Sequence, residues 1–162
     1  MNEPLLRAAH QSLGNLVTDF LKALDGIPDE DLNRWKPAAE QQGGGDMSTF
    51  AALGVHTASA ATWMILHQTF GHDFPRDRVL EFEAETTRAE IDDLFHTLMQ
   101  RFGELIETDG DVDLTALPPS IRPAFPEWNR TNWLLHAIDH TAQHLGHIEI
   151  TRQLWLAERG QA

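Results

Sequence analysis

Residues 132–155 have the sequence NWLLHAIDHTAQHLGHIEITRQLW, and the spacing of their apolar side chains predicts one long helix. Histidines recur in this segment at intervals of four and three residues. At about 100° per residue, the four imidazoles fall within an arc of roughly 80° and form one stripe along the helix. The stripe consists of His136, His140, His144 and His147, and apolar side chains flank it: Leu134, Leu135, Ile138, Leu145, Ile148 and Leu154.

Helical periodicity extends beyond this segment and accounts for most of the chain. We find no strand-like alternation of useful length and no internal repeat. The sequence therefore predicts an all-α fold of four long helices packed as a four-helix bundle. The expected helices cover about residues 4–25, 48–70, 87–107 and 130–157.

The expected helix ends and connections follow from polar, Gly and Pro residues. Ser48 is expected to cap the second helix, and Thr87 with Glu90 fits the capping box that begins the third. The first connection contains a low-complexity run of three glycines at 43–45, and Trp35 is its expected anchor. The last connection contains four prolines and is expected to form no regular helix.

Length and composition predict one domain spanning residues 1–162, because 162 residues with 41% hydrophobic content can bury a core of ordinary size. No apolar run approaches the roughly 20 residues that span a bilayer. The start MNEPLLRAAH lacks the basic and apolar regions of a secretory signal, so a cytoplasmic location is expected. The absence of cysteine excludes disulfides and thiolate ligands, and any metal must bind nitrogen or oxygen.

The formal net charge is −13, with 12 Lys+Arg against 25 Asp+Glu. Such a chain would repel a phosphate backbone unless its basic residues were tightly clustered, and along the sequence they are scattered. We therefore expect no nucleic-acid partner and no membrane partner. The negative net charge does not exclude a small anionic ligand that is held by one or two local arginines.

The pair His140 and His144, spaced i and i+4 on one helix, is close enough to share a divalent ion. A third ligand is available from His56, which lies among small residues in FAALGVHTASAATW near the middle of the second helix. Three protein nitrogens would leave an open position for water or substrate. The alternative for the pair is a set of imidazoles that are hydrogen-bonded in the ordinary way or face solvent.

The remaining histidines are expected to serve other roles. A third ligand from the same helix would crowd the ion, so His136 and His147 are expected to be structural or to support the ligands. The others lie alone or near a helix end and are expected to be structural or solvated: His10, His67, His72 and His96.

The order of these parts resembles the DinB-like superfamily of four-helix bundles, which includes YfiT-like metal hydrolases and thiol-dependent S-transferases. The resemblance rests on His56 seven residues before Trp63, and on HAIDHTAQHLGHI at 136–148. It implies that His56, His140 and His144 take the positions of the family's metal triad. Family members often have glutamine at the position of His147, so this residue is expected to tune the site or add a ligand.

The resemblance also implies an up-down-down-up order of the helices, a homodimer, and nickel or zinc as the ion. This order requires a crossover between the second and third helices, and residues 71–86 could span a helix length of about 35 Å. Imidazole suits zinc, nickel, copper and iron, so the ligands alone leave the choice of metal open.

Two classes of function follow. In the first, a metal-dependent hydrolase or thiol S-transferase activates water or a low-molecular-weight thiol. No basic cluster for an acidic thiol is evident, although Arg152 could hold a substrate carboxylate or lie at a surface or dimer interface. In the second, a non-catalytic metal-binding or stress-response bundle uses the ion for stability or sensing. Asp139 and Glu149 point away from the stripe, and Ser59, one turn from His56, lacks a nucleophile-elbow motif.

Overall fold

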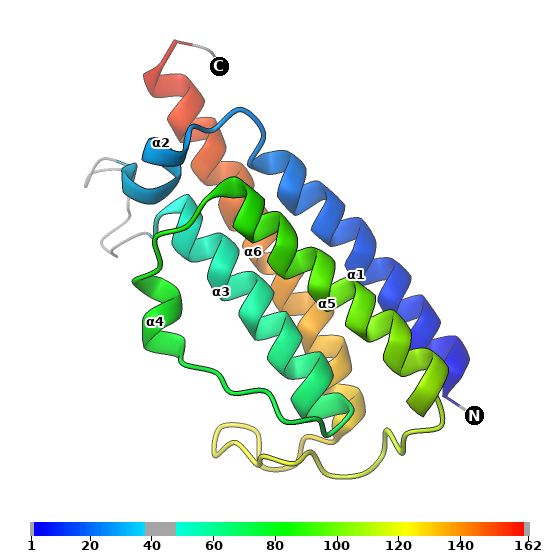
Figure 1. The fold of residues 1–162 in the computed structure, drawn as a ribbon. Coiled ribbons are helices and arrows are strands. Elements are labelled where there is room, and N and C mark those ends of the chain that lie inside the picture. The colour runs from blue at the N-terminus through cyan, green and yellow to red at the C-terminus, as the bar shows by residue number, and fades with distance from the viewer. Residues whose placement is uncertain (1, 38–47, 161–162) are drawn as a thin grey trace.

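The computed structural model describes residues 2–37 and 48–160, and over these ranges the chain is helical, with no strand (Figure 1). The glycine run at 43–45 lies outside the described residues. None of the described helices combines the length and the apolar character needed to cross a bilayer. The elements are α1 (Glu3–Ala23), α2 (Asp29–Arg34), α3 (Phe50–Thr62), the π-helical segment η2 (Trp63–Thr69), α4 (Arg78–Phe82), α5 (Arg88–Asp109) and α6 (Arg130–Glu158).

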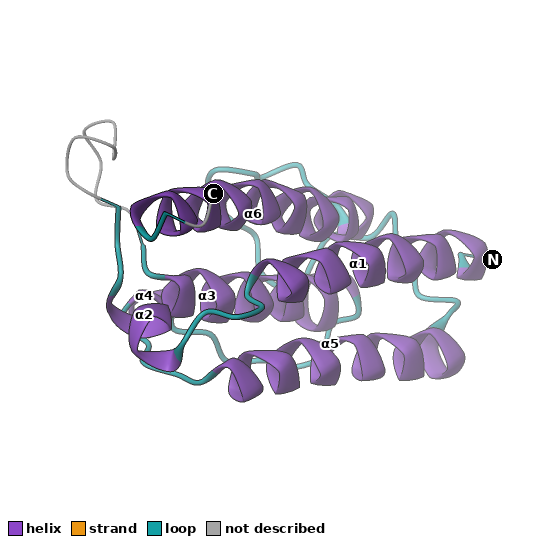
Figure 2. Cartoon of the chain, turned by 90° about the horizontal axis from the view of Figure 1, so that it is seen from above, coloured by secondary structure: helices purple, strands orange, loops and turns teal. Residues whose placement is uncertain are grey.

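Four long helical segments lie side by side: α1, α3 with η2, α5 and α6 (Figures 1 and 2). Both α1 and α3 pack against both α5 and α6, while η2 packs against α6. In Figure 1, α1 and α6 run toward one end of the molecule and α3 and α5 run toward the other. The α3 helix, which carries His56, thus lies directly against the histidine-rich α6.

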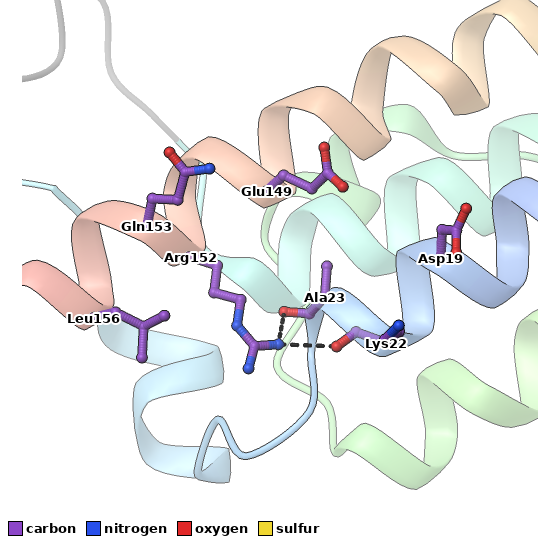
Figure 3. Close-up of a pocket in the computed structure, with 7 residues that line it drawn as sticks. All are labelled: Asp19, Lys22, Ala23, Glu149, Arg152, Gln153 and Leu156. Carbon is purple, nitrogen blue, oxygen red and sulfur yellow. Dashed lines mark hydrogen bonds between the residues drawn. The ribbon is translucent and has the colours of Figure 1, made fainter. Parts of the chain in front are cut away.

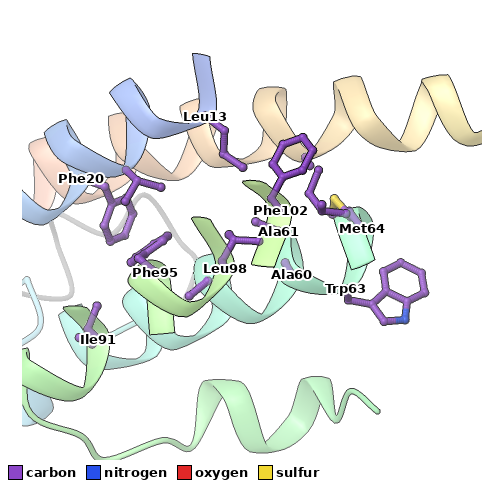
Figure 4. Close-up of a cluster of buried hydrophobic side chains, with 14 of the residues drawn as sticks. Leu13, Phe20, Ala60, Ala61, Trp63, Met64, Ile91, Phe95, Leu98 and Phe102 are labelled. Atoms are coloured by element: carbon purple, nitrogen blue, oxygen red, sulfur yellow. The ribbon is translucent and has the colours of Figure 1, made fainter. Parts of the chain in front are cut away.

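The core lies between these four segments and is rich in phenylalanine (Figure 4). Phe20 of α1 packs against Phe95 of α5, with ring centroids 5.3 Å apart. The large apolar side chains of α5 are mostly buried, with Leu94 as the exception at 39% exposed. Removing large apolar side chains from water is the main stabilising contribution to such a core. Four phenylalanines are fully buried: Phe20, Phe50, Phe95 and Phe102.

Helix ends follow local hydrogen bonding, and one expected cap is wrong. The second long helix begins at Phe50 and not at Ser48, because the Thr49 side chain accepts a hydrogen bond from the backbone N–H of Ala52. The capping box of α5 is confirmed, with Thr87 and Glu90 each accepting from the other's backbone N–H. These bonds satisfy donors that the first turn of a helix cannot pair internally.

Two connections that the sequence predicted to be plain linkers contain short helices. In the first, α2 follows Pro28, and three acidic residues in its first turn suit the positive end of the helix dipole. In the second, α4 begins where Asp77 Oδ1 accepts from the N–H groups of Val79 and Leu80. Trp35 anchors the first connection as expected, since its ring stacks on Phe50 and its Nε1 donates to Glu158.

Candidate metal centre

Three histidines from two helices converge at one point: His56 of α3 with His140 and His144 of α6. One ring nitrogen from each lies within 4.8 Å of the others. Ring centroids are 4.4 Å apart for the α6 pair, and 5.2 and 5.0 Å from His56 to His140 and His144. Ligands of a tetrahedral zinc ion lie about 3.3 Å apart, so small rotations of these side chains would bring the nitrogens to ligand distance. The sequence prediction of a shared point is met, and ligation of an ion stays a prediction.

The backbone explains why these side chains meet. Residues four apart on a helix share a face, which places His140 and His144 one above the other on α6. Around His56, small residues let neighbouring helices approach closely. At Gly54 a Cβ atom would lie only 2.8 Å from Ile91 Cδ1 of α5. The small residues of α3 therefore set the close packing that holds His56 inside the bundle, where it is 4% exposed.

A buried carboxylate orients His56. Its Nδ1 lies 2.8 Å from Glu81 Oε2, and Glu81 accepts two hydrogen bonds from the Arg76 guanidinium, at 2.6 and 2.9 Å. A carboxylate held by arginine can only accept, so the Nδ1 of His56 carries the proton. Its Nε2 then keeps a lone pair for an ion, in the arrangement by which carboxylates commonly orient metal-binding histidines.

Glu81 could not be identified as a site residue from helical periodicity, because it lies in the connection that was expected to be a plain linker. Its helix, α4, covers the site, and Phe82 stacks on the His56 ring with centroids 4.5 Å apart. Neither acid considered from sequence contacts the triad: Asp139 accepts a hydrogen bond from Gln143 and lies 4.0 Å from the Nδ1 of His136, and Glu149 is exposed. The only sequence feature that could have indicated Glu81 is its place in the first turn after Asp77, a residue type that often caps helices.

The three histidines are held neutral at physiological pH. The pKa of His140 is lowered to about 3, chiefly by burial and then by the nearby imidazoles and Arg76. Burial also lowers the pKa of His144 to about 4, with His56 as the next cause. For His56, burial lowers the pKa and outweighs the opposing bond to Glu81. Neutral imidazoles are the form that binds metal, so no proton has to leave before an ion enters.

A buried nitrogen without a hydrogen-bond partner also indicates metal binding at this site. The Nδ1 of His140 is buried and has no hydrogen-bond partner among the described residues. Leaving a buried polar atom unpaired costs about 1–3 kcal/mol, so native structures rarely keep one without a reason. Three neutral imidazoles, one oriented by a carboxylate and one with an unsatisfied nitrogen, fit a divalent ion that prefers nitrogen ligands.

Metal-free protein is expected to lose unfolding free energy as the pH falls below about 6.5. The unfolded chain binds protons on its histidines near this pH, whereas His140 in the folded chain stays neutral down to about pH 3. Protonation thus favours unfolding, and His140 alone accounts for about 2 kcal/mol of the loss between pH 6.5 and pH 5. Urea unfolding with chelator at the two pH values measures the loss, and His140→Gln should reduce it by about this amount. Identical pH dependence in the two proteins would count against a buried, neutral His140.

The other histidines of the stripe lie beside the triad. The His136 ring is 5.8 Å from that of His140 and packs against Trp128, and burial lowers its pKa. The Nδ1 of His147 lies 3.4 Å from that of His144, but His147 is exposed. The His67 ring bonds to Ser120 Oγ, while His10 bonds to the carbonyl of Met99. Among the described residues only the triad brings three ligand atoms together.

A cavity of about 200 Å³ adjoins the triad and is lined by His56, His136 and His140. Its other walls include three arginines: Arg76, Arg78 and Arg122. Arg122 is more than 40 residues from Arg76 and Arg78 in the sequence, so the three did not stand out as a basic cluster. The expectation that the chain lacks a basic cluster is therefore wrong, because folding gathers three guanidinium groups at one cavity beside the histidines.

Arg152 has a structural role away from this site. Its Nη1 donates to the backbone carbonyls of Lys22 and Ala23 at the end of α1, at 2.9 and 3.0 Å (Figure 3). Such bonds help to cap the last turn of a helix, where the Lys22 carbonyl also accepts from the Asp25 N–H. The open groove that Arg152 lines with Asp19 and Glu149 contains none of the histidines. Likewise, no hydrogen bond joins Ser59 to His56 within the described part of the chain, and the His56 Nδ1 is bonded to Glu81.

The chain matches the model of a known protein family. The family model described as the DinB superfamily matches residues 15–148, which include all three histidines of the triad and the three arginines. No curated protein and no solved structure matches the chain.

Proposed function

Because this chain belongs to the DinB superfamily, we propose that it is a metal-dependent enzyme, a hydrolase or a thiol S-transferase, with His56, His140 and His144 as ligands of one divalent ion. The ion is nickel or zinc, as the family resemblance implies. The four long helical segments are then a four-helix bundle in up-down-down-up order, forming a single domain.

The observation that carries this proposal is the convergence of three neutral imidazoles on one point. One of them is oriented by a buried carboxylate, which keeps its free nitrogen directed toward the other two. Orientation by a second layer of residues is a regular property of metal sites and is usually needed for full affinity. A chance cluster of histidines would have no need of the Glu81 and Arg76 pair beneath it.

An open cavity beside the triad favours catalysis over a purely structural ion. A divalent ion bound there would supply Lewis acidity, lowering the pKa of water or of a thiol in its open position. The protein's own residues do the rest: Glu81 fixes the His56 ring, Phe82 covers that ring on one side, and Trp63 and Trp133 form apolar walls. Together these residues would hold a small substrate beside His56 and His140.

The second candidate is a non-catalytic metal-binding bundle, and the position of His147 favours it. If its ring turned toward the triad, His147 could complete a closed four-nitrogen site, which is typical of structural ions. Against this, His147 is exposed and lies on the far side of His144 from His140 in the chain. The cavity lined by His136 and His140 offers a position for substrate that a closed site would not require.

Metal analysis tests the proposal. Protein purified without a histidine tag should retain about one nickel or zinc ion per chain, and chelation should lower its melting temperature. An ion present at 100 times its dissociation constant stabilises the folded state by about 2.7 kcal/mol. Protein without metal, whose melting temperature is unchanged by chelator and by added ions, would contradict the proposal.

Activity assays separate the candidate reactions. Metal-dependent consumption of a low-molecular-weight thiol with a panel of electrophiles would identify a transferase. Metal-dependent ester or amide hydrolysis with unchanged thiol would identify a hydrolase. Neither reaction, in protein that holds its ion, would favour the non-catalytic candidate.

A further inference from the structure

We propose that Arg78 and Arg122, supported by Arg76, form a subsite for the anionic group of the substrate or thiol co-substrate, a carboxylate or a phosphate. The role of the bound molecule as a substrate rests on the proposed function, whereas the anion site itself rests on the arginines. The anion site lies beside the histidine triad, because the three arginines line the same cavity as His56 and His140.

Two connections that are distant in the sequence supply the arginines of the subsite. Arg76 and Arg78 flank the N-cap of α4, and Arg122 lies in the loop between α5 and α6. The loop is tied to η2 by three contacts. Gln68, which is fully buried, bonds to both the N–H and the carbonyl of Ser120, and His67 bonds to the Ser120 hydroxyl. The position of Arg122 is thus set by the fold.

The charges of the subsite are not balanced by protein acids. Arg76 is paired with Glu81, but Arg78 and Arg122 form no ion pair with any described residue. The nearest acid in sequence, Asp77, uses its Oδ1 to cap α4. No Asp or Glu lines this cavity or the adjoining one of about 150 Å³ between Trp63 and the arginines. In a chain with a net charge of −13, two unpaired guanidinium groups at an acid-free cavity favour an anion as their partner.

Aromatic rings hold the guanidinium groups in place. Arg122 and Arg76 lie over the Trp63 ring, at 5.1 and 5.8 Å from its centroid, and Arg78 lies 5.8 Å from Phe82. In Figure 4 the Trp63 indole projects out of the core cluster. A guanidinium stacked on a ring keeps its N–H edge free for a ligand, and its planar fork matches carboxylate and phosphate oxygens.

The size and lining of the cavity limit the ligand. A volume of about 200 Å³ is below the range of about 300–1,000 Å³ typical of sites for whole drug-sized molecules. Phe125 and Trp133 add aromatic walls next to the arginines. We infer a small molecule, or one arm of a larger one, with an anionic head at the arginines and an apolar part toward the histidines.

Calorimetric titration with simple probes tests the subsite. The probes are phenyl phosphate, benzoate and the neutral analogue benzamide, each added to chelated protein and to protein reloaded with zinc. At least one anion should bind the metal-free protein, and benzamide should not; the anion that binds more tightly distinguishes phosphate from carboxylate. Arg78→Gln and Arg122→Gln should each weaken binding about tenfold, because each removes a charge-assisted hydrogen bond.

Arg101→Gln is the matched control, since Arg101 is an exposed arginine of α5 that lines neither cavity. It should leave the affinity unchanged. Equal binding of benzamide, absence of binding by both anions, or an equal loss in Arg101→Gln would overturn the subsite. Binding that appears only with zinc and ignores both test substitutions would also overturn it, while leaving the metal proposal intact. If the protein binds the anion but takes up no metal, the proposed function is contradicted and the anion subsite still stands.

Discussion

Replacing His140 with alanine should lower the affinity for zinc or nickel at least a hundredfold. Four-ligand zinc sites bind with about 10–16 kcal/mol, so one ligand contributes on the order of 3 kcal/mol. The His140 ring lies close to both partners, 4.4 Å from His144 and 5.2 Å from His56. Without it, one nitrogen from each of two helices would remain, too few to enclose an ion. Competition against a chromophoric chelator measures the affinity.

His96→Ala is the control for this experiment, because His96 is an exposed histidine of α5 and lies outside the triad. It should bind the ion as the wild type does. Circular dichroism of the metal-free proteins should show that both variants keep their helices. If His140→Ala retained wild-type affinity, the triad would not be the metal site, and the catalytic proposal would fall with it.

Replacing Glu81 with alanine should lower both the unfolding free energy and the metal affinity. Glu81 is 5% exposed and is the partner of two buried groups, the His56 Nδ1 and the Arg76 guanidinium. Removing one member of a buried charged network costs about 3–5 kcal/mol, since the others lose their partner without regaining water. Loss of the carboxylate that orients a ligand typically weakens metal binding 10–100-fold. Urea unfolding with chelator and competition titration measure the two effects separately.

Two further variants make the Glu81 result specific. Glu83→Ala removes an exposed carboxylate at the end of the same short helix and should change neither quantity appreciably. Glu81→Gln keeps the shape of the side chain and should recover part of the stability while leaving the affinity reduced. Equal behaviour of Glu81→Ala and Glu83→Ala would show that the carboxylate does not support His56.

Most of the helix positions could be predicted from local sequence patterns, namely apolar spacing and capping residues. Apolar spacing located the four long segments, and the Thr87 and Glu90 capping box was readable because its bonds join residues three apart. The pairing of His140 with His144 was readable for a similar reason, since residues one turn apart share a helix face whatever surrounds them. The cap at Thr49 was missed because Ser48 is chemically equivalent and adjacent, and only the backbone geometry selects between them.

The sequence by itself determined the all-helical class, the helix positions within a few residues, and the α6 half of the histidine cluster, because periodicity and caps act between near neighbours. Only the tertiary structure decided that Glu81 and Arg76 lie beneath His56, that Arg122 joins Arg78 at the cavity, and that Arg152 caps α1. These contacts join segments separated by many residues, often through connections with no periodicity of their own. Such contacts depend on where core packing places the connecting segments. Local sequence patterns contain no information about that placement.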